Sequence, residues 1–149
     1  MTKKSSKETQ ESLVANMQSW QKVENAAIVS TGRVIEKTEN PIVRLVMEII
    51  QRDSQMHYRV QEWIAESLES RTVSLTPEDM SDVWGMIEDH IAIEQRTIKL
   101  AQESLNMIKD SRGMTVQAYL LEYLLADESK HEMLLGQLGK IQKGMYPYG

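Results

Sequence analysis

Residues 124–135, LLADESKHEMLL, place a carboxylate and an imidazole in the middle of an apolar helical pattern. From Leu121 to Leu138, alternating steps of three and four residues meet only leucine, except at Glu128 and His131. This spacing puts the whole series on one face of an α-helix. Charged groups on such a face are costly to bury unless they are paired or bound to a cation. The stretch therefore predicts a helix whose buried face carries a polar site.

Three earlier segments repeat this pattern of one apolar stripe with a polar interruption near its middle. A single carboxylate of this kind could turn to the rim or meet a lysine, but four segments that break at mid-length indicate one shared site. The stripes contain no lysine or arginine that would balance the charge. The interruptions are Glu24 in residues 7–37, Asp53 and His57 in 41–67, Glu94 in 77–109, and Glu128 and His131 in 115–140.

Helix-start signals separate the four segments. Asn40 and Thr76 each precede a proline, which is the pattern of an N-cap followed by proline at the first helical position. Residues 110–113, DSRG, form the predicted turn before the last helix. Glycine and proline are otherwise rare, with seven and three residues, which favours helix over sheet. We therefore expect an all-α, antiparallel four-helix bundle in one domain, 1–149, with the bundle over about 7–140 and a polar tail before it and a short one after it.

The composition argues against several classes of partner and metal site. The chain has 22 acidic and 17 basic residues, three histidines and no cysteine. An acidic balance argues against nucleic-acid or membrane partners, which need clustered lysine and arginine. The absence of cysteine excludes disulfides, thiolate metal sites and iron–sulfur clusters. With no signal-peptide pattern and no apolar run near the ~20 residues of a membrane span, we expect a cytoplasmic protein.

The interruptions fall on one level within each predicted pair of helices. At ~1.5 Å per residue, Glu24 and Asp53 both lie about 18–20 Å from the turn between their segments. The distances of Glu94 and Glu128 from the 110–113 turn, measured along their helices, agree within about 3 Å. Carboxylates and imidazoles gathered in this way suit iron and manganese, which would neutralise their charge.

This arrangement resembles the ferritin-like di-iron carboxylate proteins, in particular the rubrerythrin and bacterioferritin branch. That family takes one glutamate from each of two helices and a Glu-x-x-His pair from each of the other two. Here Glu128-Ser-Lys-His131 matches the pair, and Glu24 and Glu94 match the single glutamates. The resemblance implies two iron ions, or iron with manganese, bound by Glu24, Asp53, Glu94 and Glu128 with His57 and His131. It also implies ferroxidase- or peroxidase-like chemistry with oxygen or peroxide.

Residues 41–67 depart from the family pattern. Ser54 stands three residues before His57, where the family has glutamate. Asp53 is the nearest carboxylate, although it is shorter and displaced by about 100° around the helix. His90, one turn before Glu94, is a further candidate ligand, with a place at the edge of the core as the alternative. The departure leaves open whether the site binds two metals or one.

The sequence also leaves undecided how the second and third segments are connected in space. The family runs these helices in parallel, but a connector of about eight residues spans only about 27 Å. Shorter helices, a simple up-down-up-down bundle or exchange of helix pairs between two chains would each resolve this.

An enzyme of this kind would need an external electron donor, because rubrerythrin's cysteine-bound iron is impossible here. We also expect a homodimer or higher homo-oligomer. The alternative is a non-enzymatic bundle with a degenerate metal site, acting as a dimeric interaction or stress-associated protein.

Overall fold

The computed structural model describes residues 5–71 and 73–145, and over these residues the protein contains five α-helices and no strand. The all-α prediction is confirmed, while the ferritin-like bundle stays a prediction. The far ends of the two predicted tails, residues 1–4 and 146–149, lie outside the described residues. The helices are α1 (Ser6–Lys37), α2 (Pro41–Glu69), α3 (Pro77–Met80), α4 (Trp84–Ile108) and α5 (Thr115–Gln142).

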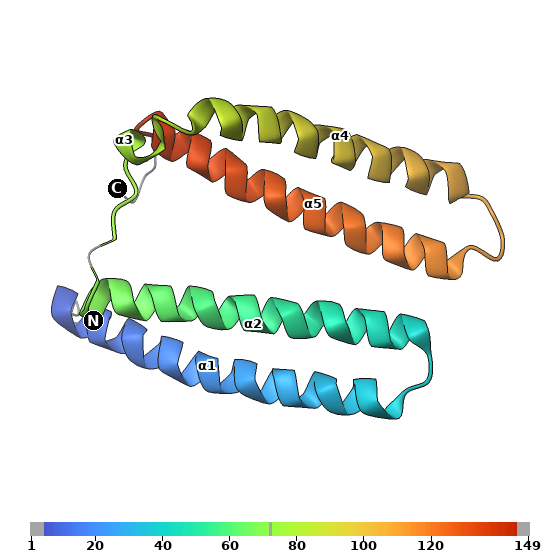
Figure 1. Ribbon diagram of the computed structural model, residues 1–149, viewed down its shortest axis with the longest axis horizontal. Helices are drawn as coiled ribbons and strands as arrows, with labels where there is room; N and C mark the ends of the chain where they lie inside the picture. Colours follow the sequence, from blue (N-terminus) through green and yellow to red (C-terminus); the bar gives the residue numbers. More distant parts are fainter. Residues whose placement is uncertain (1–4, 72, 146–149) are drawn as a thin grey trace. The chain divides into compact units, whose positions relative to one another are not determined.

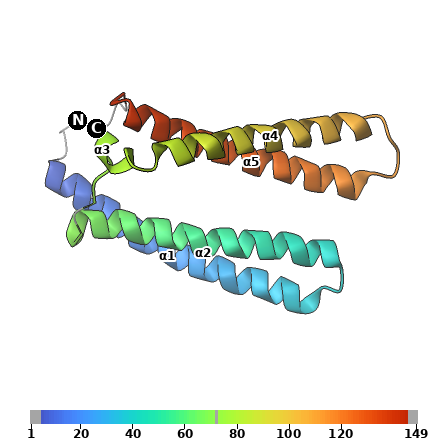
Figure 2. The same cartoon turned by 45° about the horizontal axis from the view of Figure 1, so that its top comes forward.

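The helices form two compact units, Met1–Val73 and Ser74–Gly149. In the first, α1 and α2 lie side by side as an antiparallel hairpin (Figures 1 and 2). In the second, α4 and α5 form another antiparallel hairpin, and the short α3 contacts α5. We call these units the first and second hairpins, and each is described by itself.

Local capping explains where the helices begin. Asn40 Oδ1 accepts hydrogen bonds from the backbone amides of Ile42 at 2.9 Å and Val43 at 3.2 Å, and Pro41 occupies the first turn of α2. This confirms the predicted cap. The α2 helix runs to Glu69, two residues beyond the predicted end, so a shorter second helix does not resolve the connector problem.

The predicted helix over 77–109 is wrong in one respect, because it is broken at residues 81–83. Asp79 Oδ2 accepts from the Thr76 backbone amide at 2.6 Å and closes the start of α3. The Ser81 hydroxyl then donates to the Glu78 carbonyl at 2.9 Å, and the Val83 amide donates to the Met80 carbonyl at 3.1 Å. Hydrogen bonds of this short-range kind compete with the helical ladder, so the long helix α4 begins only at Trp84.

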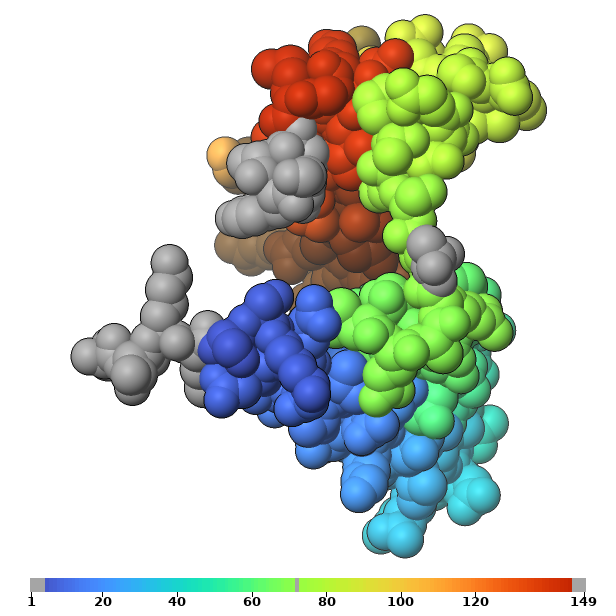
Figure 3. All heavy atoms as spheres, turned by 90° about the vertical axis from the view of Figure 1, so that its left-hand side faces the viewer, coloured from blue at the N-terminus to red at the C-terminus, as the bar shows by residue number. Residues whose placement is uncertain are grey.

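The first hairpin has a thin apolar core. Val14, Met17 and Ala65 are buried between α1 and α2, and Ile64 and Leu68 pack against them. Figure 3 looks onto the end where α1 begins and α2 ends, and the side chains of the two helices lie against each other there. Other apolar residues of the α1 stripe are not covered within the hairpin. Trp20, for example, is 51% exposed.

The second hairpin follows the predicted stripe of α4 closely. Met80 and Ala101 are buried, and Ile87, Ile91 and Ile98 are half-buried along the same face. The α5 helix has no buried residue although its sequence is apolar on more than one side, with Tyr119, Leu124 and Leu134 exposed. In the part of the chain that the structure describes, no helix is both long enough and apolar enough to cross a membrane.

Candidate metal centre

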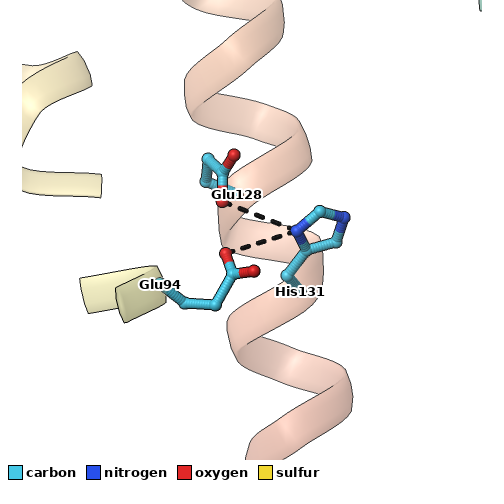
Figure 4. Close-up of side chains that lie close together, drawn as sticks. All are labelled: Glu94, Glu128 and His131. Carbon is cyan, nitrogen blue, oxygen red and sulfur yellow. Dashed lines mark hydrogen bonds and ion pairs between the residues drawn. The ribbon is translucent and has the colours of Figure 1, made fainter. Parts of the chain in front are cut away.

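Two neighbouring helices of the second hairpin bring Glu94, Glu128 and His131 together. Glu94 lies on α4, while Glu128 and His131 lie one turn apart on α5. His131 Nδ1 is 3.3 Å from Glu94 Oε2 and 3.5 Å from Glu128 Oε2, as Figure 4 shows. One ligand atom from each residue lies within 4.8 Å of the other two. We call these three residues the carboxylate–histidine cluster.

Glu94 is the most enclosed member of this cluster. Its side chain is only 12% exposed, so neighbouring groups have to compensate its charge. Hydrogen bonding with Glu128 is the largest cause that lowers the pKa of Glu94 below its ordinary value of 4.5. Burial opposes this effect, and contacts with His131 and His90 add to it. The net lowering favours the ionised carboxylate, which is the form that binds a cation.

His90 extends the cluster by one turn of α4. Its Nε2 lies 2.9 Å from Glu94 Oε1, so the two oxygens of Glu94 face two different imidazoles. The His90 side chain is about half exposed and lines an open depression of about 240 Å³ together with Glu94, His131, Leu134 and Leu135. The structure therefore places His90 beside the cluster and at its solvent side, where it could add a nitrogen ligand.

Asp127 is a neighbour of the cluster that the sequence pattern did not single out. Its Oδ2 lies 3.4 Å from His131 Nε2, and its Oδ1 lies 2.7 Å from Lys130 Nζ. A carboxylate beside one ring nitrogen of a ligand histidine helps to fix the orientation of the imidazole. Asp127 therefore steadies His131 from the Nε2 side, while Nδ1 makes its hydrogen bond to Glu94 Oε2, which accepts. Its position four residues before His131 is the signal that could have identified it.

Thr97 joins the two helices next to the cluster and was also missed. Its hydroxyl lies 2.9 Å from Glu128 Oε2 and 2.7 Å from the backbone carbonyl of Glu94. A hydroxyl has one proton to donate, so these two acceptors compete for it. When the proton points to Glu128, Thr97 holds that carboxylate beside α4. The spacing of three residues from Glu94 places Thr97 on the same side of the helix.

The first hairpin gathers a second, smaller polar group. Glu24 is buried at 6% exposure on α1, and His57 Nδ1 on α2 lies 3.4 Å from Glu24 Oε1. Gln61, one turn beyond His57, donates from Nε2 to the same Glu24 oxygen at 3.2 Å. Sequence reasoning named Glu24 and His57 but not Gln61, which occupies a position of the helical face that is usually apolar.

The structure does not bring Asp53 into this group. Among the described residues, the Asp53 side chain has no hydrogen bond or ion pair, whereas the adjacent Ser54 is buried at 6% exposure. One residue corresponds to about 100° of rotation, so the serine side chain, and not that of Asp53, takes the buried position. A ligand role for Asp53 stays a prediction.

Six of the seven candidate ligands thus fall into two groups, Glu24 with His57 in the first hairpin and Glu94, Glu128, His131 and His90 in the second. Comparison of the chain with family models, curated proteins and solved structures found no match. What the two groups can do therefore follows from their own chemistry.

The lowered pKa of Glu94 predicts a specific dependence of stability on pH. Because its folded pKa is below the unfolded value near 4.5, its contribution is complete above that value. The contribution is then lost as pH falls through the folded pKa. We expect Glu94→Gln to lose less stability on acidification than the wild type, measured by urea unfolding at several pH values with a chelator present. Glu103→Gln, which removes an exposed partner of Lys99, is the control and should follow the wild type; identical pH profiles for Glu94→Gln and wild type would contradict the prediction.

Proposed function

We propose that this protein is a ferritin-like metal-binding protein whose carboxylates and imidazoles hold iron, or iron with manganese. The observation that carries the proposal is the carboxylate–histidine cluster, with three ligand atoms within 4.8 Å of one another. Carboxylate oxygen and imidazole nitrogen are the donors that iron and manganese accept in proteins. The cluster therefore has the donor chemistry that such an ion requires.

The electrostatics of the cluster also favour a cation. His131 Nδ1 makes a hydrogen bond to Glu94 Oε2 at 3.3 Å and lies 3.5 Å from Glu128 Oε2. Two carboxylates that converge on one point repel each other unless a positive group lies between them. A bound ion would take the place of the Nδ1 proton, so binding should release protons.

We propose that Glu24 and His57 are metal ligands as well, so that the protein would hold two ions. Fe(II) held by these residues would supply electrons to oxygen or peroxide, in a ferroxidase- or peroxidase-like reaction. The chain has no cysteine to hold an electron-transfer iron, so the electron donor would be a separate molecule.

A specific observation favours the alternative, a non-enzymatic helical protein with a degenerate metal site. The α2 helix presents Ser54, not a carboxylate, to the inside of the first hairpin, and Asp53 stands apart from Glu24. The first hairpin then supplies one carboxylate fewer than the family's ligand set. Metal content, and not activity, separates the two functions most directly.

Substitution of the cluster glutamates should remove metal binding. The full-length protein, purified without a metal-affinity tag and stripped with a chelator, is titrated anaerobically with Fe(II) and its metal content is measured by mass spectrometry. We expect two ions per wild-type chain and a fall of at least about 100-fold in affinity for Glu94→Gln and Glu128→Gln, because each loses a charged ligand. Glu103→Gln on the outer face of α4 should bind as the wild type does. A wild-type protein that binds no metal would overturn the proposal and leave the non-enzymatic alternative.

Asp127→Asn tests whether the carboxylate next to His131 Nε2 affects the metal affinity of the cluster. The change keeps the side-chain shape but removes the charge that orients the imidazole, so metal affinity should fall by about 10- to 100-fold. The loss should be smaller than for Glu94→Gln in the same Fe(II) titration. Equal affinities of Asp127→Asn and wild type would show that Asp127 serves only its ion pair with Lys130.

The uncovered apolar faces predict self-association. A helix that is apolar on more than one side needs more than one packing partner, and α5 has no buried residue within its own hairpin. We therefore propose a homodimer or a higher homo-oligomer. Sedimentation velocity over a range of protein concentrations should give a mass of at least two chains, and a monomer at every concentration would contradict the proposal.

A further inference from the structure

Gln61 presents a buried oxygen atom that has no partner. The residue lies on α2 at 3% exposure, and its Nε2 donates to Glu24 Oε1 at 3.2 Å. Its other amide atom, Oε1, has no hydrogen bond among the described residues. A buried carbonyl oxygen without a partner is costly, and such atoms in native proteins are commonly satisfied by a water or an ion.

The neighbouring carboxylate determines how the amide is oriented. If the amide were reversed, Gln61 Oε1 would face Glu24 Oε1, and both atoms are hydrogen-bond acceptors. The observed orientation avoids this repulsion by giving the N–H to Glu24. The carbonyl oxygen is therefore left without a partner inside the hairpin. A cation beside Glu24 and His57, whose Nδ1 lies 3.4 Å from Glu24 Oε1, would reverse this preference, because it attracts the carbonyl oxygen and repels the N–H.

The three groups together offer a ligand set for a hard or borderline cation. Glu24 supplies an anionic oxygen, His57 a nitrogen and Gln61 a neutral amide oxygen. Gln61 follows His57 by four residues, so both side chains lie on the same side of α2. Ser54, three residues before His57, provides no carboxylate. We propose that Gln61 Oε1 is a metal ligand of the first hairpin and takes the place of the carboxylate that α2 lacks at Ser54.

This inference rests on the proposed function, because it concerns the ion that Glu24 and His57 would share. It assigns a residue that neither the sequence pattern nor the family resemblance indicated. It also predicts a site with a lower negative charge than two carboxylates would give. A water molecule on Gln61 Oε1, with no role for Gln61 in metal binding, is the competing explanation.

Two substitutions at Gln61 have opposite expected effects on metal affinity. Gln61→Leu removes the oxygen and should weaken Mn(II) binding by at least about 10-fold. Gln61→Glu supplies a charged oxygen and should strengthen Mn(II) binding by about 10-fold, because a carboxylate is the better ligand for this ion. Without metal, however, Gln61→Glu should lower the melting temperature, since it puts two carboxylates in contact inside the hairpin. A water-binding or purely structural Gln61 would leave the Mn(II) affinity of a folded Gln61→Leu variant unchanged, so the Gln61→Leu result separates the two explanations.

Gln51 provides a matched control on the same helix. It is also a partly buried glutamine of α2 that donates across the hairpin, from Nε2 to the Ile28 carbonyl at 3.1 Å, but within residues 5–71 and 73–145 it has no hydrogen bond with a carboxylate. Gln51→Leu and Gln51→Glu should change the melting temperature without changing Mn(II) affinity. Helix content by circular dichroism and the metal-free melting temperature show which variants are folded.

The experiment uses the chelator-stripped full chain, with Mn(II) binding followed by electron paramagnetic resonance and the melting temperature measured with and without Mn(II). Folded Gln61 variants that bind like the wild type would overturn this inference and leave the proposed function standing. Binding that depends on Gln61 but not on Glu94 or Glu128 would support the inference and overturn the centre in the second hairpin. A wild-type chain that binds no Mn(II) and no Fe(II) would overturn both.

Discussion

A carboxylate buried between two helices must be compensated, and Glu24 imposes this constraint on the first hairpin. Its charge is met by the amide of Gln61 and the imidazole of His57, both on α2. These polar groups occupy positions that would otherwise be apolar, so the buried core of the hairpin is reduced to Val14, Met17 and Ala65. Burying Glu24 and its polar partners therefore reduces the apolar area that is buried in the hairpin, and with it the hydrophobic contribution to stability.

The second hairpin shows the same conflict between a polar cluster and an apolar core. Glu94, Glu128 and His131 occupy the middle of the contact between α4 and α5, and Ala101 is the one residue of α4 that is buried. Clusters of partly enclosed ionisable groups with a perturbed pKa occur most often where they have a function. Structural ion-pair networks also perturb such groups, which is why metal content is the decisive measurement for this cluster.

Much of the local architecture could be predicted from residue patterns. The cap at Asn40, the turn at residues 110–113 and the polar interruptions near the middle of each long helix are all features of short-range chemistry. The break at residues 81–83 could not be predicted from periodicity, because the apolar stripe continues through it from Met80 to Trp84. There the short-range hydrogen bonds of Ser81 and Val83 outweigh the helical pattern.

The order of residues was sufficient to establish that the chain is helical and that each long helix carries ionisable groups inside its apolar stripe. Only the packing of helix against helix decided which residues meet. One step along a helix turns a side chain by about 100°, so the rotation of α2 about its axis decides that Ser54 and Gln61, and not Asp53, lie inside the first hairpin. In the second hairpin, the rotation of α4 about its own axis decides that Thr97 reaches Glu128 on α5. Such rotations depend on contacts between residues more than thirty positions apart, and no local pattern contains that information.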